Sequence, residues 1–350
     1  MDTVVPIAAR SKDRGGPAQP LLLAQGLRKH FPVQGGLFGR SGKVVRAVDD
    51  LSFAVGKGET LGVVGESGCG KSTAARLLIR LIKPDAGTMA LDGDPVDEPH
   101  GVSINELRRQ VQMVFQDSYA SLNPRLTIAE TVAFAPKAHG LAASEARERV
   151  RGLLTMVGLD PEAYLERYPH ELSGGQRQRV NIARALALRP RLVILDEAVS
   201  ALDKSVEAQV LNVLVDLKAE LDLTYVFISH DLNVVQYLSD RVLVMYLGKI
   251  VEIGPVEKIY SDPQHPYTWA LLSARPSMDP RKRTHEAPIQ GDPPNPIDPP
   301  SGCRFRTRCP YAEEVCARVE PPLYSLGEDR QSVACHMRNA SSGHSKAATA

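Results

Sequence analysis

The segment from Gly65 to Thr73 constrains the fold of this chain more than any other. It reads Gly-Glu-Ser-Gly-Cys-Gly-Lys-Ser-Thr and matches the pattern G-x-x-x-x-G-K-[ST]. The apolar run 60–64 before it predicts a buried strand, and the run 73–81 after it is apolar at helical spacing. A strand, a glycine loop and a helix N-terminus together form an anion site, because free N–H groups and the helix dipole both point at the phosphate. We therefore expect the chain to bind a nucleotide.

Within this loop, we expect Lys71 to reach the β- and γ-phosphates and the Ser72 hydroxyl to bind Mg²⁺. Cys69 occupies a variable position of the pattern, where a small filler residue is the simpler interpretation. The residues expected to line the nucleotide phosphates are Gly65, Ser67, Gly68, Cys69, Gly70, Lys71, Ser72 and Thr73.

The charge balance and the apolar runs exclude several classes of protein. A net charge of +1 argues against a general nucleic-acid-binding surface, so nucleic acid is not an expected partner. No apolar run approaches the ~18 residues of a membrane span. The apolar stretch near the N-terminus is too short for a secretory signal. We expect a cytosolic protein, with any membrane role exerted through a partner.

Strand-like and helix-like segments alternate from residue 21 to about 255, which predicts an α/β domain with a largely parallel sheet. The expected strands include 49–55, 192–195 and 225–228, and the expected helices include 143–157 and 176–188. The helical segments between about 117 and 190 predict a helical insertion in this domain.

The segments outside the α/β domain differ from it in composition. Residues 1–20 and 339–350 are polar or small, and we expect a disordered leader and a disordered tail. Residues 256–302 become rich in proline, which favours a wrapped linker. The remaining segment, 303–338, holds most of the cysteines.

Two acids follow the apolar strand 192–195. We expect Asp196 to hold Mg²⁺, directly or through water, and Glu197 to polarise the water that attacks the γ-phosphate. The alternative is a pair of solvated acids at a strand end.

A second glycine run, Leu172-Ser173-Gly174-Gly175-Gln176, precedes the expected helix 177–188. It predicts a second anion site at a helix N-terminus. The alternative is an ordinary helix start with Ser173 as its N-cap.

The Ser-Gly-Gly-Gln run, placed between the phosphate loop and the acidic strand, resembles the signature of ABC-transporter ATPase subunits. The resemblance implies a P-loop NTPase fold, with a RecA-like core sheet, an antiparallel β subdomain, an inserted α-helical subdomain and a small cysteine-rich C-terminal extension. It also implies two subunits packed head to tail, so that ATP lies between the phosphate loop of one and the signature of the other. The signature residues that would contact the partner's ATP are Ser173, Gly174, Gly175 and Gln176.

Further positions resemble landmarks of the same family. Gln116 matches the glutamine that touches Mg²⁺ and the attacking water and reports to the membrane subunit. Asp203 ends the loop that lies between the two ATP sites, and His230 matches the histidine that contacts the γ-phosphate. Phe31 stands where the family places an aromatic on adenine, although a core aromatic is the alternative there. Taken singly, His230 also fits a satisfied turn residue.

Narrower resemblance points to ATPases of oligopeptide and dipeptide importers. The segments 116–125 and 264–272 resemble theirs, and the leader 27–33 is similar to the F-type half, which pairs with a D-type ATPase. The resemblance implies two transmembrane permease subunits, an extracytoplasmic solute-binding protein and a place on the cytoplasmic face of the plasma membrane. Nickel, glutathione or sugars are alternative cargoes. A soluble ABC ATPase of ribosomes or DNA repair, or a non-catalytic regulatory subunit, is an alternative function.

Four of the five cysteines, Cys303, Cys309, Cys316 and Cys335, fall within the last 48 residues. In a reducing compartment such clustering favours a metal over disulfides. The close C-x2–4-C pair of zinc sites is absent. The resemblance to peptide-importer ATPases implies a [4Fe–4S] cluster, with Zn²⁺ or unligated or disulfide-bonded cysteines as the alternatives.

Overall fold

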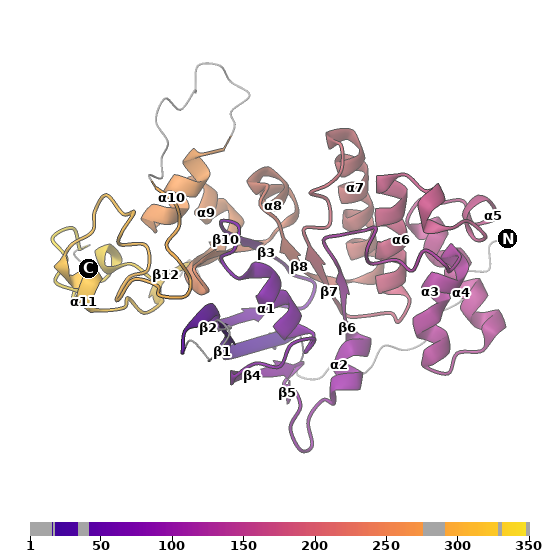
Figure 1. Ribbon diagram of the computed structural model, residues 1–350, viewed down its shortest axis with the longest axis horizontal. Coiled ribbons are helices and arrows are strands. Elements are labelled where there is room, and N and C mark those ends of the chain that lie inside the picture. Colours follow the sequence, from indigo (N-terminus) through magenta and orange to yellow (C-terminus); the bar gives the residue numbers. More distant parts are fainter. Residues whose placement is uncertain (1–15, 17, 34–41, 276–290, 328–330, 348–350) are drawn as a thin grey trace.

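The computed structural model describes residues 16, 18–33, 42–275, 291–327 and 331–347. Most of the expected leader at 1–20, residues 276–290 of the expected linker and the last residues of the expected tail lie outside this part of the chain. Figure 1 shows a block of helices at one end of the molecule, the C-terminal segment at the other end, and the strands between them.

The central sheet has eight strands in the order β11-β12-β10-β9-β3-β8-β7-β6. Its parallel strands are β3 (Thr60–Val64), β6 (Val111–Val114), β7 (Leu192–Asp196), β8 (Thr224–Ile228) and β9 (Arg241–Tyr246). Its antiparallel strands are β10 (Lys249–Pro255), β11 (Tyr324–Leu326) and β12 (Gln331–Val333). Every residue of β3, β7 and β8 is buried, as expected for parallel strands covered on both faces.

The register of the parallel strands brings the functional loops together. Val63 of β3 pairs with Ile228 of β8, and Ile228 also pairs with Asp196 of β7. Val114 of β6 pairs with Leu195. The carboxyl ends of these four strands therefore lie at one edge of the sheet, which is where ligands of open α/β sheets bind.

A second, antiparallel sheet has the order β2-β1-β4-β5. Its strands are β1 (Leu22–Pro32), β2 (Val44–Val55), β4 (Ala86–Leu91) and β5 (Asp94–Pro95). The expected strand 49–55 is thus the second half of β2. In Figure 1 this sheet lies beside α1 (Lys71–Leu78), which is the helix that follows the phosphate loop.

The remaining helices fall into three groups along the chain. The helix before β6 is α2 (Ile104–Gln110). The helical block comprises α3 (Ile128–Ala138), α4 (Ala143–Met156), α5 (Pro161–Tyr164), the 3₁₀ turn η1 (Pro169–Glu171) and α6 (Gly174–Leu186). The later helices are α7 (Lys204–Leu221), α8 (Leu232–Leu238), α9 (Val256–Ser261), α10 (Pro266–Ser273), α11 (Glu314–Arg318) and the 3₁₀ turn η3 (His336–Arg338).

Two buried clusters cover the two faces of the central sheet. Successive strand residues alternate between them, because side chains of a strand point to opposite faces. Val193 and Leu195 join the cluster that also contains residues of α3, α4, α6 and α7. Ile194 and Val63 join the cluster that contains residues of α1 and of the antiparallel sheet. The central sheet is therefore a buried layer between helices on one face and the second sheet with α1 on the other.

The α/β architecture with a parallel core, an antiparallel sheet and a helical block is as predicted. The cysteine-bearing segment is tied directly to the core, because β12 pairs with β10 through Glu252↔Val333 and Ile253↔Ser332. It extends the central sheet instead of standing apart as an added unit. Among the described residues, no helix combines the length and the apolar composition needed to cross a bilayer.

Candidate functional site

The phosphate loop turns sharply from β3 into α1, and two glycines make the turn possible. Gly65 has φ of 150° and Gly70 has φ of 109°, which is backbone that favours glycine. A Cβ on Gly70 would lie 2.1 Å from the carbonyl oxygen of Ala47, and a Cβ on Gly65 would lie 2.2 Å from that of Met245. The strands packed around the loop therefore exclude any side chain at either position.

The polar groups of the loop are held by contacts within the site. Lys71 Nζ is buried and donates to the carbonyl oxygens of Gly65, at 2.7 Å, and Glu66, at 3.0 Å. Lys71 begins α1, so the first N–H groups of this helix lack carbonyl partners within the helix. The loop thus presents a lysine and a helix N-terminus together, which is the arrangement that binds phosphate.

Cys69 lies in the same loop but is buried. Burial raises the pKa of its thiol, against the opposing effect of the nearby Lys71 ammonium. A buried, neutral thiol fits the interpretation of Cys69 as a small filler residue.

The hydroxyl of Ser72 and the carboxylate of Asp196 fit a magnesium site. Ser72 Oγ donates to Asp196 Oδ1 at 3.1 Å, although the two residues come from different elements. Burial raises the pKa of the Asp196 carboxyl, so a cation beside it would relieve the cost of its charge. Hard oxygen donors of this kind are the ligands that Mg²⁺ prefers.

Glu197 stands at the centre of a second set of contacts, immediately after β7. Gln116 Nε2 donates to Glu197 Oε2 at 2.8 Å, and His230 Nδ1 lies 3.6 Å from the same oxygen. Glu197 has φ of 49°, a left-handed conformation that is costly for a residue with a long side chain. Such strain is typical of functional sites. The structure thus brings Gln116, Glu197 and His230 together, with Asp196 immediately before Glu197 in the chain.

The signature residues lie at the N-terminus of α6 and form a capping box. Ser173 is exposed and its hydroxyl accepts from the backbone N–H of Gln176 at 3.3 Å, while Gln176 Oε1 accepts from Ser173 N at 3.0 Å. The N-cap alternative therefore describes Ser173 correctly within one chain. Its exposure also leaves the helix N-terminus open to a ligand or a second chain.

The loop that ends at Asp203 packs beside this helix start. A Cβ on Gly175 would lie 2.3 Å from Val206 Cγ1, so α6 and α7 approach closely at their N-terminal ends. Lys204, which follows Asp203, donates to Asp231 Oδ2 at 2.7 Å. Asp231 is the neighbour of His230, so the loop that ends at Asp203 is joined to the segment that carries this histidine.

Phe31 lies near the end of β1, where it pairs with Val45 of β2. Its ring is half-buried and does not belong to either buried cluster, which argues against the core-aromatic alternative. Lys29 Nζ lies 5.6 Å from the centre of the ring.

The segment after Gln116 is held by α6. Asn181 Nδ2 donates to Ser118 O at 3.1 Å, and Asn181 Oδ1 accepts from Ser121 Oγ at 3.0 Å. Arg177 of the same helix stacks on the exposed ring of Tyr119 at 5.4 Å. The helix that begins at the signature therefore also positions the loop that carries Gln116.

The prediction of a [4Fe–4S] cluster, and of Zn²⁺ in its place, is wrong. Cys303, Cys309, Cys316 and Cys335 do line one small cavity. Among the described residues, however, no group of three or more histidine, cysteine or acidic side chains is arranged to hold a metal ion. All four cysteines are free thiols.

The surroundings of these cysteines explain the correction. Burial raises the pKa of the Cys303 thiol to about 12 and that of the Cys335 thiol to about 11. At these pKa values the neutral thiol is the favoured form. Cys303 and Cys309 pack against the larger buried cluster, as apolar side chains do.

Sequence reasoning assigned no role to three residues that meet at the phosphate loop. Glu66 N donates to Tyr267 Oη at 2.8 Å, and Arg308 Nη1 donates to Glu66 Oε2 at 2.7 Å. Tyr267 lies in the segment 264–272, and the resemblance of this segment to peptide-importer ATPases is the feature of the sequence that could have drawn attention to it. Arg308 lies next to Cys309, and no motif in the sequence around it indicates a contact with the phosphate loop.

Comparison with known proteins agrees with this geometry. The family described as "ABC transporter" matches residues 48–200, and the family described as "Oligopeptide/dipeptide transporter, C-terminal region" matches residues 251–316. The chain is 51% identical to the probable peptide ABC transporter ATP-binding protein y4tS of Sinorhizobium fredii, over 91% of this chain and 90% of that protein. It is 47% identical to the oligopeptide transport ATP-binding protein AppF of Bacillus subtilis, over 91% of this chain and 98% of that protein.

Among solved structures, the fold resembles that of the dimeric ATP-binding cassette MJ0796 bound to ADP and Pi. The TM-score is 0.59 at 27% sequence identity, and the match covers 67% of this chain and 98% of the cassette. The family matches, the identities and the phosphate-loop geometry agree with one another. The chain therefore belongs to the ATP-binding subunits of ABC transporters, in the group that carries the oligopeptide/dipeptide transporter C-terminal region.

Proposed function

We propose that this chain hydrolyses ATP to power the import of peptides, as one ATPase subunit of a membrane transporter. The observation that carries the proposal is the convergence of Gln116 and His230 on one carboxylate oxygen of Glu197, beside the phosphate loop. The names of relatives such as y4tS and AppF, which refer to peptides, support this cargo.

In the proposed reaction, Lys71 and the N-terminus of α1 hold the phosphates of ATP. Glu197 orients a water molecule and accepts its proton as the water oxygen bonds to the γ-phosphorus, and the bond to ADP breaks. Gln116 and His230 hold the Glu197 carboxylate in place for this step. Mg²⁺, held by Ser72 and Asp196, would neutralise charge on the phosphate oxygens.

We propose that a second ATPase subunit, of the D type, completes the site with its own signature. The exposed Ser173 and the open N-terminus of α6 support the reciprocal contact, because a helix N-terminus attracts a γ-phosphate presented by another chain. The nucleotide drives closure only by its higher affinity for the closed pair. Phe31 would stack on adenine, and Asp203 would lie between the two sites.

The assembly would also contain two permease subunits and an extracytoplasmic solute-binding protein, with this chain on the cytoplasmic face of the membrane. The contacts of α6 with Ser118 and Ser121 support a route from the signature helix, through the loop after Gln116, to a permease. Residues 21–255 would form the ATPase domain, 256–302 the linker and 303–338 the C-terminal region.

Reconstitution of the full chain in liposomes with its partner ATPase and permeases would test the cargo. Labelled peptides, nickel, glutathione and a sugar would be offered through the solute-binding protein, with uptake and ATP hydrolysis measured together. We expect peptides to stimulate both. Uptake of another solute in place of peptides would contradict the cargo, and hydrolysis without uptake of any would contradict the coupling.

A further inference from the structure

Glu66, the second residue of the phosphate loop, is held by two segments that follow the ATPase domain, α10 and the C-terminal region. Its backbone N–H donates to Tyr267 Oη at 2.8 Å, and Tyr267 belongs to α10. Its carboxylate accepts two hydrogen bonds from Arg308, at 2.7 Å and 3.0 Å. These contacts join positions 201 and 242 residues apart in the sequence.

The pairing of Arg308 with Glu66 is of the strong kind. The Arg308 side chain is only 6% exposed and that of Glu66 is 25% exposed. Two parallel N–H···O bonds between a guanidinium and a carboxylate fix direction as well as distance. Separating the pair would break two charge-assisted hydrogen bonds of a side chain that is largely buried, which is costly. The loop and the segment that carries Arg308 therefore keep their relative positions.

A cluster of three aromatic rings packs beside both contacts. The rings of Tyr246, Tyr267 and Phe305 lie 4.7 to 5.4 Å apart between centres. Arg308 stacks near the Tyr246 ring, at 5.9 Å. Because these rings are buried or nearly so, the positions of the Tyr267 hydroxyl and the Arg308 guanidinium are set by packing.

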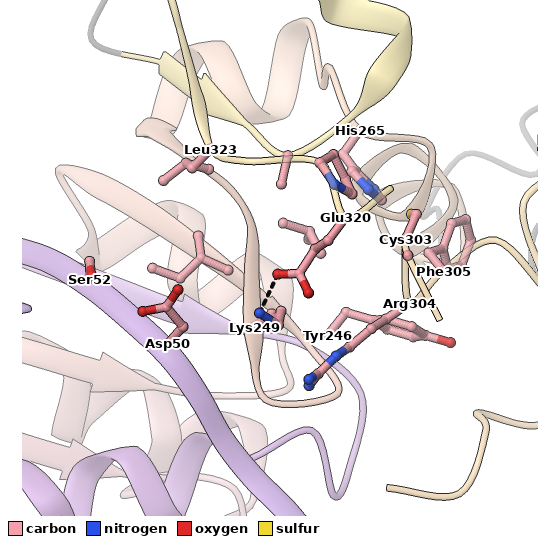
Figure 2. A pocket seen from close by; sticks show the side chains of 15 residues that line it. Asp50, Ser52, Tyr246, Lys249, His265, Cys303, Arg304, Phe305, Glu320 and Leu323 are labelled. Carbon is pink, nitrogen blue, oxygen red and sulfur yellow. Dashed lines mark hydrogen bonds and ion pairs between the residues drawn. The ribbon is translucent and has the colours of Figure 1, made fainter. Parts of the chain in front are cut away.

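A second arginine fixes the same segment four residues earlier. Arg304 is buried, and its guanidinium donates to the carbonyl of Leu247 and to Asp49 of β2. Figure 2 shows Arg304, Phe305 and Tyr246 gathered on one side of a cavity, across from Asp50 and Ser52 of β2. Residues 304–308 thus span from β2 to the phosphate loop and are anchored at both ends.

The contacts continue from Glu66 to the lysine of the site. The carbonyl oxygen of Glu66 accepts from Lys71 Nζ at 3.0 Å and from Cys69 N at 3.2 Å. A shift of Glu66 would therefore move the acceptor that holds Lys71. Small displacements of groups that hold a substrate are costly, because binding and orientation depend on preset geometry.

We propose that Arg308 and Tyr267 are positioning residues for the phosphate loop, through which α10 and the C-terminal region set the affinity of the site for ATP. This role goes beyond hydrolysis and cargo, and it rests on the assignment of Gly65–Thr73 as the ATP site. A bridge that only attached the C-terminal region would change stability and leave ATP affinity unchanged.

The test measures the dissociation constant of ATP and the thermal midpoint of the full chain. For Arg308→Ala, we expect ATP binding to weaken by about 3- to 30-fold, the range for residues that act on a site without touching the ligand. Arg308→Lys keeps the charge but not the paired hydrogen bonds, so its ATP affinity should lie between those of the wild type and Arg308→Ala. Tyr267→Phe, which removes one oxygen, should shift affinity in the same direction. The matched control is Arg306→Ala, because Arg306 donates to Ser301 of its own segment, and it should bind ATP as the wild type does.

A double-mutant cycle with Glu66→Ala separates positioning from simple attachment. We expect Arg308→Ala to weaken ATP binding little further once Glu66 is replaced, because both changes break the same hydrogen bonds between Arg308 and Glu66. Independent effects of Arg308→Ala and Glu66→Ala on ATP affinity would overturn the proposal. So would wild-type ATP affinity in both Arg308→Lys and Tyr267→Phe, a result that can be obtained even if Arg308→Ala fails to fold. Lys71→Ala serves as the reference for the site itself. If it retained ATP affinity, the assignment of the ATP site would fail instead.

Discussion

Gln116 Nε2 donates a hydrogen bond to Glu197 Oε2 at 2.8 Å, across 81 residues of sequence. Gln116 follows the edge strand β6, and Glu197 follows β7, which pairs with it. The loop that leads into the helical block therefore touches the carboxylate proposed to activate water. A movement of that loop would therefore shift or break the hydrogen bond to the Glu197 carboxylate.

Replacing Gln116 by alanine should slow ATP hydrolysis by about 10- to 100-fold, because a hydrogen bond to a charged group is lost. ATP affinity should change much less, since Gln116 contacts Glu197 and not the loop. Steady-state hydrolysis by the assembled transporter measures both. Gln112→Ala is a matched control, because Gln112 donates to the carbonyl of Arg108 in α2, the helix before β6. Equal losses in the two variants would contradict the role of Gln116.

Replacing Lys71 by alanine should weaken ATP binding by about 10- to 100-fold, through loss of a charged donor to phosphate. The measurement is the dissociation constant of ATP for the full chain. Lys83→Ala removes an exposed lysine after α1 and should leave the constant unchanged. Retention of wild-type affinity by Lys71→Ala would show that phosphate binds elsewhere.

Alkylation rates test the state of the C-terminal cysteines. The pKa of Cys335 is raised to about 11 by burial, so its reactive thiolate should form about 100-fold less often at pH 8 than that of a cysteine of ordinary pKa. Mass spectrometry should find slow labelling of Cys303 and Cys335 in the native chain and fast labelling in urea. Labelling of the native thiols at the rate seen in urea would contradict their burial.

Because His265 is buried, we expect the free energy of unfolding to fall in acid. Burial lowers the pKa of this histidine to about 3, and its Nδ1 accepts from Tyr267 N at 3.0 Å. Below pH 6.5 the unfolded chain binds a proton that the folded chain does not, so stability falls as pH drops from 6.5 towards 3, by about 1.4 kcal/mol per unit.

The change His265→Asn keeps an acceptor for the helix cap and removes the titrating group. Its urea midpoint should therefore fall less steeply with acid than that of the wild type. His139→Asn, at an exposed position, is the control and should follow the wild type. If His265→Asn showed the full wild-type slope, this histidine would not be the titrating group.

The sequence predicted those parts of the fold that depend on neighbours along the chain. The phosphate loop, β3 and α1 lie within one short stretch, so local pattern determines them. The apolar run 192–195 predicted β7 because a strand buried on both faces has no polar side. The acids after it lie near Ser72 and Gln116, since the carboxyl ends of parallel strands share one edge, and their catalytic roles stay predictions.

The sequence failed to predict interactions between side chains that no periodic pattern of residues indicates. Cysteine spacing shows that four thiols are near one another in the chain, but metal binding depends on how their side chains are directed and desolvated. The bond between Glu66 and Arg308 joins residues 242 positions apart, and Glu66 stands at a variable position of the phosphate-loop pattern. Only the packing of the C-terminal region against the central sheet brings them together.

The most direct test of the account is the ATP turnover of the assembled transporter with Glu197→Gln. This change keeps the shape of the side chain and removes its charge. We predict that turnover falls by about 100- to 10,000-fold, as for loss of a general base, while ATP remains bound. Turnover at the wild-type rate would contradict the proposal that the carboxylate between Gln116 and His230 activates the attacking water.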